Sequence, residues 1–254
     1  MKKIFVFALV IYSICQYFSM VLYCDVPMYD IFTPRGTLVE TLLNDEQPDF
    51  RQRIMDDAWG LSFPGVELII LYDGVSSTRK FNCHGYAWLR VEEGIDRWMN
   101  RPSDEYYTDI INGMQGVNGD GSYVEVPNAT YPGKISWGMG DHSAITTAEP
   151  GWVISKWNSG PLCRHQRGQG KNPFDDTTAY PVNVRYYVKN CAALPNSYTN
   201  DTVTTNKTKY GNNFHIQNVN VNAGKLIIND CNEVNINADF EVESGAEFEI
   251  FINP

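Results

Sequence analysis

Basic residues are scarce in this chain. It has 20 lysines and arginines against 30 aspartates and glutamates, a net charge of −10 at neutral pH. Residues 1–24 hold two of the basic residues and none of the acidic ones, so the remainder carries −12. Nucleic-acid binding depends on basic surfaces that neutralise phosphates. The charge therefore argues against a nucleic-acid partner and against adhesion to anionic lipid.

Cysteine and histidine are also few, with six and four residues. None of them have the spacing of a zinc site, so we expect no metal and no other cofactor. Beyond residue 24, four cysteines remain, and sequence alone allows them to pair in three ways. They are Cys83, Cys163, Cys191 and Cys231. If Cys83 is a nucleophile it has to stay free, and the favoured bridge then joins Cys163 to Cys191.

Only one apolar run is long enough to matter for targeting. Lys2 and Lys3 precede an almost unbroken apolar stretch over residues 4–23. This pattern is typical of a signal peptide, and we interpret residues 1–24 as one, cleaved near Cys24. An uncleaved membrane anchor is the alternative, because about 20 apolar residues can span a bilayer, and a lipid on Cys24 is a lesser one. We expect a secreted, periplasmic or cell-surface protein.

The pattern of residues 25–194 predicts one α+β domain, a helix packed on an antiparallel sheet. Apolar residues at helical spacing favour helices over 48–59 and from 83 to about 94. The segment 25–47, with its prolines and glycine, predicts irregular structure. Short apolar or alternating runs bounded by turn residues predict strands over 66–72, 134–137, 142–147, 152–157 and 182–188.

The C-terminal part has a different texture. Residues 195–213 are rich in Asn and Thr with few large apolar side chains, which predicts a linker. In residues 214–254, the pattern Val219-Asn220-Val221-Asn222 recurs fifteen residues later at Val234. Short strands at a regular interval predict a small β-solenoid of stacked strands, which could serve attachment to a cell surface.

The segment around Cys83 carries the best candidate chemistry. Asn82 is a good N-cap residue, which would place Cys83 in the first helical turn. There the helix dipole favours a thiolate. A cysteine so placed is a candidate nucleophile if a histidine can reach it. The alternative is a structural cysteine, buried or in a disulfide.

Four histidines compete for the role of general base. His84 adjoins Cys83, but neighbours on a helix point about 100° apart, which argues against it. His142 opens a predicted strand, and a strand packed on a helix could direct it toward the helix N-terminus. It is therefore the favoured base, with a hydrogen-bonded structural histidine as the alternative. His165 is second choice, and His215 lies beyond the predicted linker.

Three motifs resemble those of the NlpC-type cell-wall peptidases and their CHAP amidase relatives, which are papain-like cysteine amidohydrolases. Residues 82–86 resemble the family's Asp-Cys-Ser-Gly-Phe pattern, residues 132–137 its Pro-Gly-Asp-Leu-Val-Phe strand, and residues 141–145 its Ser-His-Val-Gly-Ile strand. The resemblance implies a papain-like fold with Cys83 as nucleophile and His142 as base.

The chain resembles more fully a group of secreted Bacteroidetes proteins. They share the Asn-Cys-His-Gly-Tyr-Ala-Trp motif, an Ile-Ser-Lys-Trp segment like residues 154–157, and stacked "coathanger" strands like those after residue 214. The family's third catalytic group, which orients the imidazole, falls on Ser155 by one alignment and on Asn158 by another.

The sequence thus predicts a cysteine hydrolase acting on amide or peptide bonds, with a peptide or peptidoglycan-like substrate. The alternative hypothesis is a non-catalytic surface or adhesin-like protein with a degenerate hydrolase domain, whose stacked strands are the working part.

Overall fold

The computed structural model describes residues 25–71, 74–99, 107, 119–137, 142–167 and 184–252. The signal peptide expected over 1–24 lies outside these ranges, as do residue 72 and residues 182–183 of two expected strands. Within them, every helix is too short or too polar to cross a bilayer.

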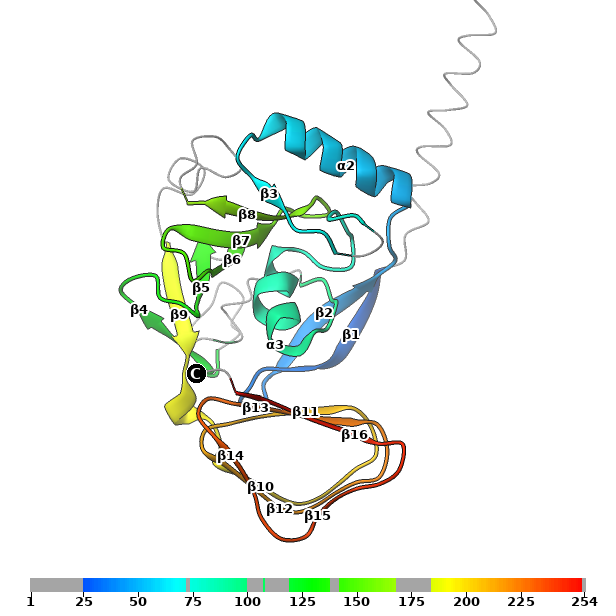
Figure 1. The fold of residues 1–254 in the computed structure, drawn as a ribbon, viewed down its shortest axis with the longest axis vertical. Helices are drawn as coiled ribbons and strands as arrows, with labels where there is room; N and C mark the ends of the chain where they lie inside the picture. Colours follow the sequence, from blue (N-terminus) through cyan, green and yellow to red (C-terminus); the bar gives the residue numbers. More distant parts are fainter. Residues whose placement is uncertain are drawn as a thin grey trace, which may run out of the picture.

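The N-terminal unit is built on a seven-stranded antiparallel sheet (Figure 1). Its strand order is β3-β8-β7-β6-β5-β9-β4. The strands expected over 142–147 and 152–157 are the central pair β6 and β7, joined in a hairpin at Pro150-Gly151, where Gly151 adopts the positive φ of 80° that the tight turn needs. The strands are β3 (Glu67–Leu68), β4 (Tyr123–Val126), β5 (Lys134–Trp137), β6 (His142–Thr146), β7 (Trp152–Lys156), β8 (Leu162–Gln166) and β9 (Arg185–Lys189).

Two helical segments accompany this sheet. The helix α2 (Asp49–Ser62) begins after Pro48, close to where sequence predicts it. The second runs over residues 83–93, with a π-helical stretch over Gly85–Arg90 and the final turn α3 (Val91–Glu93). We call it the Cys83 helix. Its extent confirms the prediction, and Gly94 ends it with a φ of 70°.

The Cys83 helix supplies much of the core. Trp88 is fully buried and its ring lies 5.2–5.7 Å from the rings of three tyrosines, at the angles favoured by aromatic pairs. These are Tyr107, Tyr123 and Tyr187. The hairpin of β1 (Asp25–Phe32) and β2 (Leu38–Asn44) adds Ile31 and Val39 to the same cluster.

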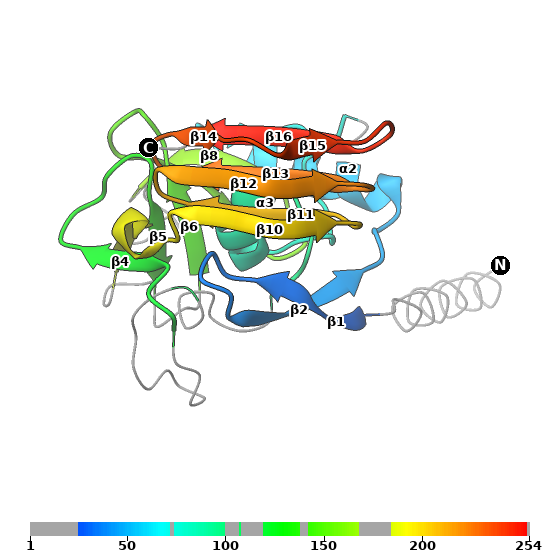
Figure 2. The ribbon, with the colours of Figure 1, turned by 90° about the horizontal axis from the view of Figure 1, so that it is seen from below.

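The C-terminal unit is a parallel strand stack, seen end-on in Figure 1 and from the side in Figure 2. One of its sheets pairs β10 with β12 and β12 with β14 and β15, and the other runs β11-β13-β16. Its interior is closed by apolar side chains such as Val203, Ile216 and Leu226, all 0% exposed. The strands are β10 (Ser197–Val203), β11 (Lys207–Gly211), β12 (Phe214–Val221), β13 (Lys225–Asp230), β14 (Val234–Ile236), β15 (Phe240–Val242) and β16 (Glu247–Ile252).

The stack predicted for 214–254 is present, but two details of the prediction are wrong. Residues 195–213 are not a linker, because they form β10 and β11, the first level of the stack. The fifteen-residue recurrence is not the spacing between levels. Val234 lies beside Phe214 in the register, not beside Val219.

The α+β, papain-like fold expected for the N-terminal unit is also wrong. Among the described residues, 45% lie in strands and 15% in helices, and the strands form several separate sheets rather than a helix-on-sheet α+β domain. Strands in segments without a clear strand pattern account for much of the difference. β1 contains Pro27, which argues against a strand, and β8 has a single large apolar residue, Leu162.

The two units are joined by a disulfide and by hydrogen bonds. The disulfide links Cys191, just after β9, to Cys231 at the end of β13, so the predicted pairing of Cys163 with Cys191 is wrong. Tyr210 Oη also donates to Glu93 Oε1 at 2.7 Å, and Asn229 Nδ2 to the Glu92 carbonyl at 3.3 Å. The stack therefore rests on the C-terminal end of the Cys83 helix.

Candidate active site

Asn82 fixes the start of the Cys83 helix. Its Oδ1 accepts the backbone N–H of Gly85 at 2.9 Å, which is the N-cap bond that the sequence predicts. The same side chain binds the backbone of Met99, accepting its N–H at 3.2 Å and donating to its carbonyl at 2.7 Å. Cys83 thus lies in the first turn of a helix whose N-terminus is held from both sides.

Gly85 is required by close packing. A Cβ added here would lie 2.0 Å from the carbonyl oxygen of Arg97, far inside van der Waals contact. The chain segment around Arg97 and Met99 therefore passes directly against the helix at this turn. Packing, rather than flexibility, explains the glycine two positions after the cysteine.

Cys83 is a free thiol, 8% exposed, that interacts with two imidazoles. Burial raises its pKa, but attraction to His84 and His142 and hydrogen bonds with both rings outweigh this effect and bring the pKa well below 9.0. The structure therefore brings His142 to Cys83, as the sequence predicts. It also brings His84 there, although the angle between helix neighbours argues against this.

His84 reaches inward to the sheet. Its Nδ1 lies 2.8 Å from the Ser143 hydroxyl, which also accepts the indole N–H of Trp88 at 3.2 Å. One helical turn separates His84 from Trp88, so both meet the same buried serine of β6. This contact fixes the helix against the strand that carries His142.

His142 is 4% exposed and lies between two indoles. Its ring centroid is 4.1 Å from that of Trp157, with the planes 23° apart, and 5.2 Å from that of Trp137, at 31°.

The two residues expected to orient this ring lie elsewhere. The Ser155 hydroxyl is hydrogen-bonded to Nε2 of His165 at 2.8 Å, so it engages a different histidine. Asn158 has a left-handed backbone with φ 52°, and its backbone carbonyl accepts from Lys156 Nζ. Among the described residues, neither Ser155 nor Asn158 is hydrogen-bonded to His142.

Lys156 is a further candidate for the site, although an ammonium only donates and so cannot accept the N–H of an imidazole. It is 0% exposed, and its Nζ donates to the carbonyls of Thr78, Asn158 and Gly160 at 2.6–2.8 Å. Burial lowers its pKa to about 7, while attraction to Cys83 opposes that shift. Three carbonyl acceptors match the three N–H groups of an ammonium, so the geometry suits the charged form. In the sequence, Lys156 could have been noticed as the lysine of the Ile-Ser-Lys-Trp segment shared with the secreted proteins that the chain resembles.

Buried charges also gather at the other end of the Cys83 helix. Burial raises the pKa of the Glu92 carboxyl, but Lys134 and Lys189 at 2.8 and 2.9 Å outweigh it and hold the pKa far below its ordinary value. For Glu93, burial raises the pKa to about 7, because its effect is larger than the opposing effect of the hydrogen bond from the Tyr210 hydroxyl. The two neighbouring carboxyls therefore differ in charge near neutral pH.

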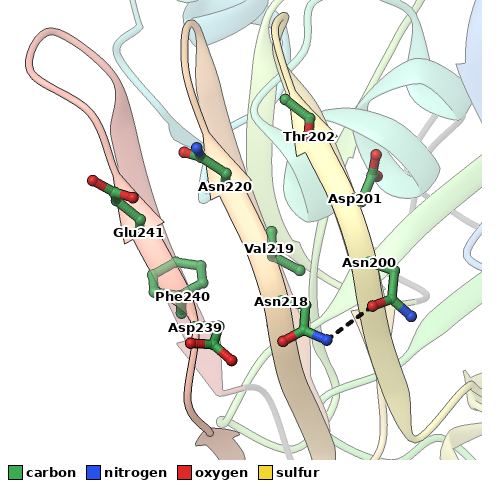
Figure 3. A pocket seen from close by; sticks show the side chains of 9 residues that line it. All are labelled: Asn200, Asp201, Thr202, Asn218, Val219, Asn220, Asp239, Phe240 and Glu241. Carbon is green, nitrogen blue, oxygen red and sulfur yellow. Dashed lines mark hydrogen bonds between the residues drawn. The ribbon is translucent and has the colours of Figure 1, made fainter.

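The strand stack carries a shallow polar depression across three levels (Figure 3). Asn200, Asn218 and Asp239 line it, and Asn218 Nδ2 donates to Asn200 Oδ1 at 2.9 Å. All three have left-handed backbones, with φ of 53–63°, a conformation that Asn and Asp tolerate best. The turn geometry accounts for these side chains without a ligand. The described residues hold no group of three His, Cys, Asp or Glu placed to bind a metal.

Comparison with family models, curated proteins and solved structures gives no match.

Proposed function

We propose that the protein is a secreted cysteine hydrolase that cleaves amide or peptide bonds through a thioester. The observation that supports this most is Cys83, a free thiol in the first turn of a helix whose pKa is lowered by two imidazoles. A nucleophile and base of this kind occur on unrelated folds. The mostly β architecture is therefore compatible with the chemistry.

In the proposed reaction the Cys83 thiolate attacks the carbonyl carbon of the substrate. The oxyanion that forms is stabilised by the Cys83 backbone N–H in the first helical turn. His142 then gives its proton to the leaving amine as the C–N bond breaks, leaving a thioester on Cys83. A water molecule then attacks the thioester while His142 takes a proton from that water. The carboxylic acid is released, and the thiolate–imidazolium pair is restored.

The proposed substrate is a peptide, and the stem peptides of peptidoglycan are the first class to test. The order of Cys83 and His142 in the chain, and the motifs around them, resemble those of the cell-wall amidohydrolases. The strand stack is proposed as a support for this domain and as a route to cell-surface attachment.

Iodoacetamide labelling tests the nucleophile directly. At about pH 6 we expect alkylation at Cys83 and none at Cys163, whose pKa burial raises to about 12. Cys163 is thus an internal control, and mass mapping separates the two sites. A Cys83 that reacts only as the pH nears 9 would contradict the proposal.

Hydrolysis of peptidoglycan peptides tests the base. Cys83→Ala should abolish turnover and His142→Ala should reduce it by about 10²–10⁴-fold. His215→Ala, at an exposed position of β12 away from Cys83, is the matched control and should hydrolyse as fast as the parent. If Cys83→Ala and His142→Ala both hydrolyse as fast as the parent, the non-catalytic surface protein becomes the better hypothesis.

A further inference from the structure

Three aromatic rings stand in a row across neighbouring strands beside Cys83. Trp137 ends β5 and pairs directly with His142, which opens β6. Trp157 follows the last residue of β7, and the pairing of Ala144 with Ser155, continued by two residues, places it on the other side of His142. The ring contacts follow this order, with Trp157 closer to His142 than Trp137.

We propose that Trp137 and Trp157 are positioning residues that hold the His142 imidazole between two indoles for its work on Cys83. This inference rests on the proposed function. With both faces covered, the ring keeps one plane, and its nitrogen-bearing edge is the part left to meet the thiol. Rigid orientation of this kind is what a third catalytic group supplies in other hydrolases.

The indoles also suit the charge that His142 carries in the reaction. The face of an indole attracts a cation, and the interaction is stronger when the pair is shielded from water. His142 is 4% exposed, so its imidazolium would be shielded in this way. Holding the imidazolium in turn keeps Cys83 in its thiolate form.

Other charged groups near Cys83 do not depend on the indoles. His84 is held by Ser143 at 2.8 Å, and Lys156 is held by three backbone carbonyls. A change at Trp157 should therefore alter the reactivity of Cys83 through His142 and leave these two contributions in place.

The test is the pH profile of Cys83 alkylation in Trp157→Leu, which keeps an apolar side chain and removes the π face. We expect the midpoint to rise by about one pH unit, a tenfold change in the thiolate equilibrium, because the variant loses one cation–π contact to the imidazolium. Peptide hydrolysis should fall together with this shift. Trp157→Phe keeps an aromatic face and should restore part of both properties, which a merely structural role would not require.

The matched control is Trp152→Leu at the opposite end of β7. Trp152 lies under the guanidinium of Arg164 at 4.1 Å, away from the row of rings, so its loss should leave the midpoint unchanged. If Trp157→Leu fails to fold, the Phe variant provides the test, with the upfield NMR shift of the His142 ring protons in the parent as a check of stacking.

The outcomes separate the two proposals. A parent with a low midpoint that Trp157→Leu and Trp157→Phe leave unchanged overturns the positioning role and preserves the hydrolase proposal. A parent midpoint near that of an ordinary thiol overturns both. Equal shifts in Trp157→Leu and Trp152→Leu would assign the effect to general loosening of β7 and would also overturn the positioning role.

Discussion

Replacing Glu93 by Gln should remove a pH dependence from the stability of this protein. Glu93 has an ordinary pKa of 4.5 and a folded pKa of about 7, because it is buried beneath the strand stack. Its carboxyl binds a proton more tightly when folded, so its contribution is fully present below pH 4.5 and is lost as the pH rises through 7.

The magnitude follows from the two pKa values. A difference of about 2.5 pKa units corresponds to about 3 kcal/mol at most, since residual contact with water screens the ionised form. Glu93→Gln stays neutral, and its amide oxygen can still accept the Tyr210 hydroxyl. The variant should therefore match the parent near pH 4 and exceed its stability near pH 8 by up to this amount.

Urea unfolding followed by tryptophan fluorescence between pH 4 and 8 measures the difference. The neighbouring Glu92 stays ionised throughout this range in both proteins, because its pKa is held low by Lys134 and Lys189. Glu125→Gln, at an exposed position of β4, is the control and should follow the parent. Parallel curves for the parent and Glu93→Gln across this range would refute the reasoning.

Two further predictions concern stability. Replacing Cys191 and Cys231 by Ala should lower the free energy of unfolding by about 4 kcal/mol, the chain-entropy value for a loop of 40 residues, and dithiothreitol should destabilise the parent but not the variant. Gly85→Ala should cost about 3 kcal/mol in thermal or urea unfolding, because its Cβ would overlap the Arg97 carbonyl. Gly60→Ala, in α2 with no atom within 4 Å of the new Cβ, is the control and should gain up to about 1 kcal/mol. Equal effects of the two glycine variants would contradict the packing argument.

Local signals predicted the local structure of the site. Asn82 predicted the start of the helix because asparagine is a good N-cap residue, and its observed bond to the Gly85 N–H is the one expected. The turn residues Pro150 and Gly151 indicated the boundary between β6, the strand that carries His142, and β7. These signals involve neighbours in the chain, where short-range sterics and hydrogen bonding decide the conformation.

Features that depend on contacts between distant parts of the chain could not be predicted from local sequence patterns. Asn200 and Asn213 lie in the segment predicted as a linker, yet they occupy left-handed positions in a strand stack, which needs such turns. Side chains of adjacent helix residues point in different directions, which argues against His84 as a partner of Cys83. In the structure the His84 ring nevertheless interacts with both Ser143 and Cys83, at the start of the helix. The partner of Cys191 could not be chosen either, since only the docking of the stack brings Cys231 to it.

The pairing of strands also sets an order in which the chain can fold. In the stack, Asn200 and Asn218 meet after only 18 residues, whereas Arg164 on β8 and Glu67 on the edge strand β3 of the large sheet are 97 residues apart. Nearby contacts close small loops and form quickly, while distant ones close slowly. The stack should therefore form before β3 pairs with β8 in the large sheet. The Cys83 helix would then pack against a stack that has already formed.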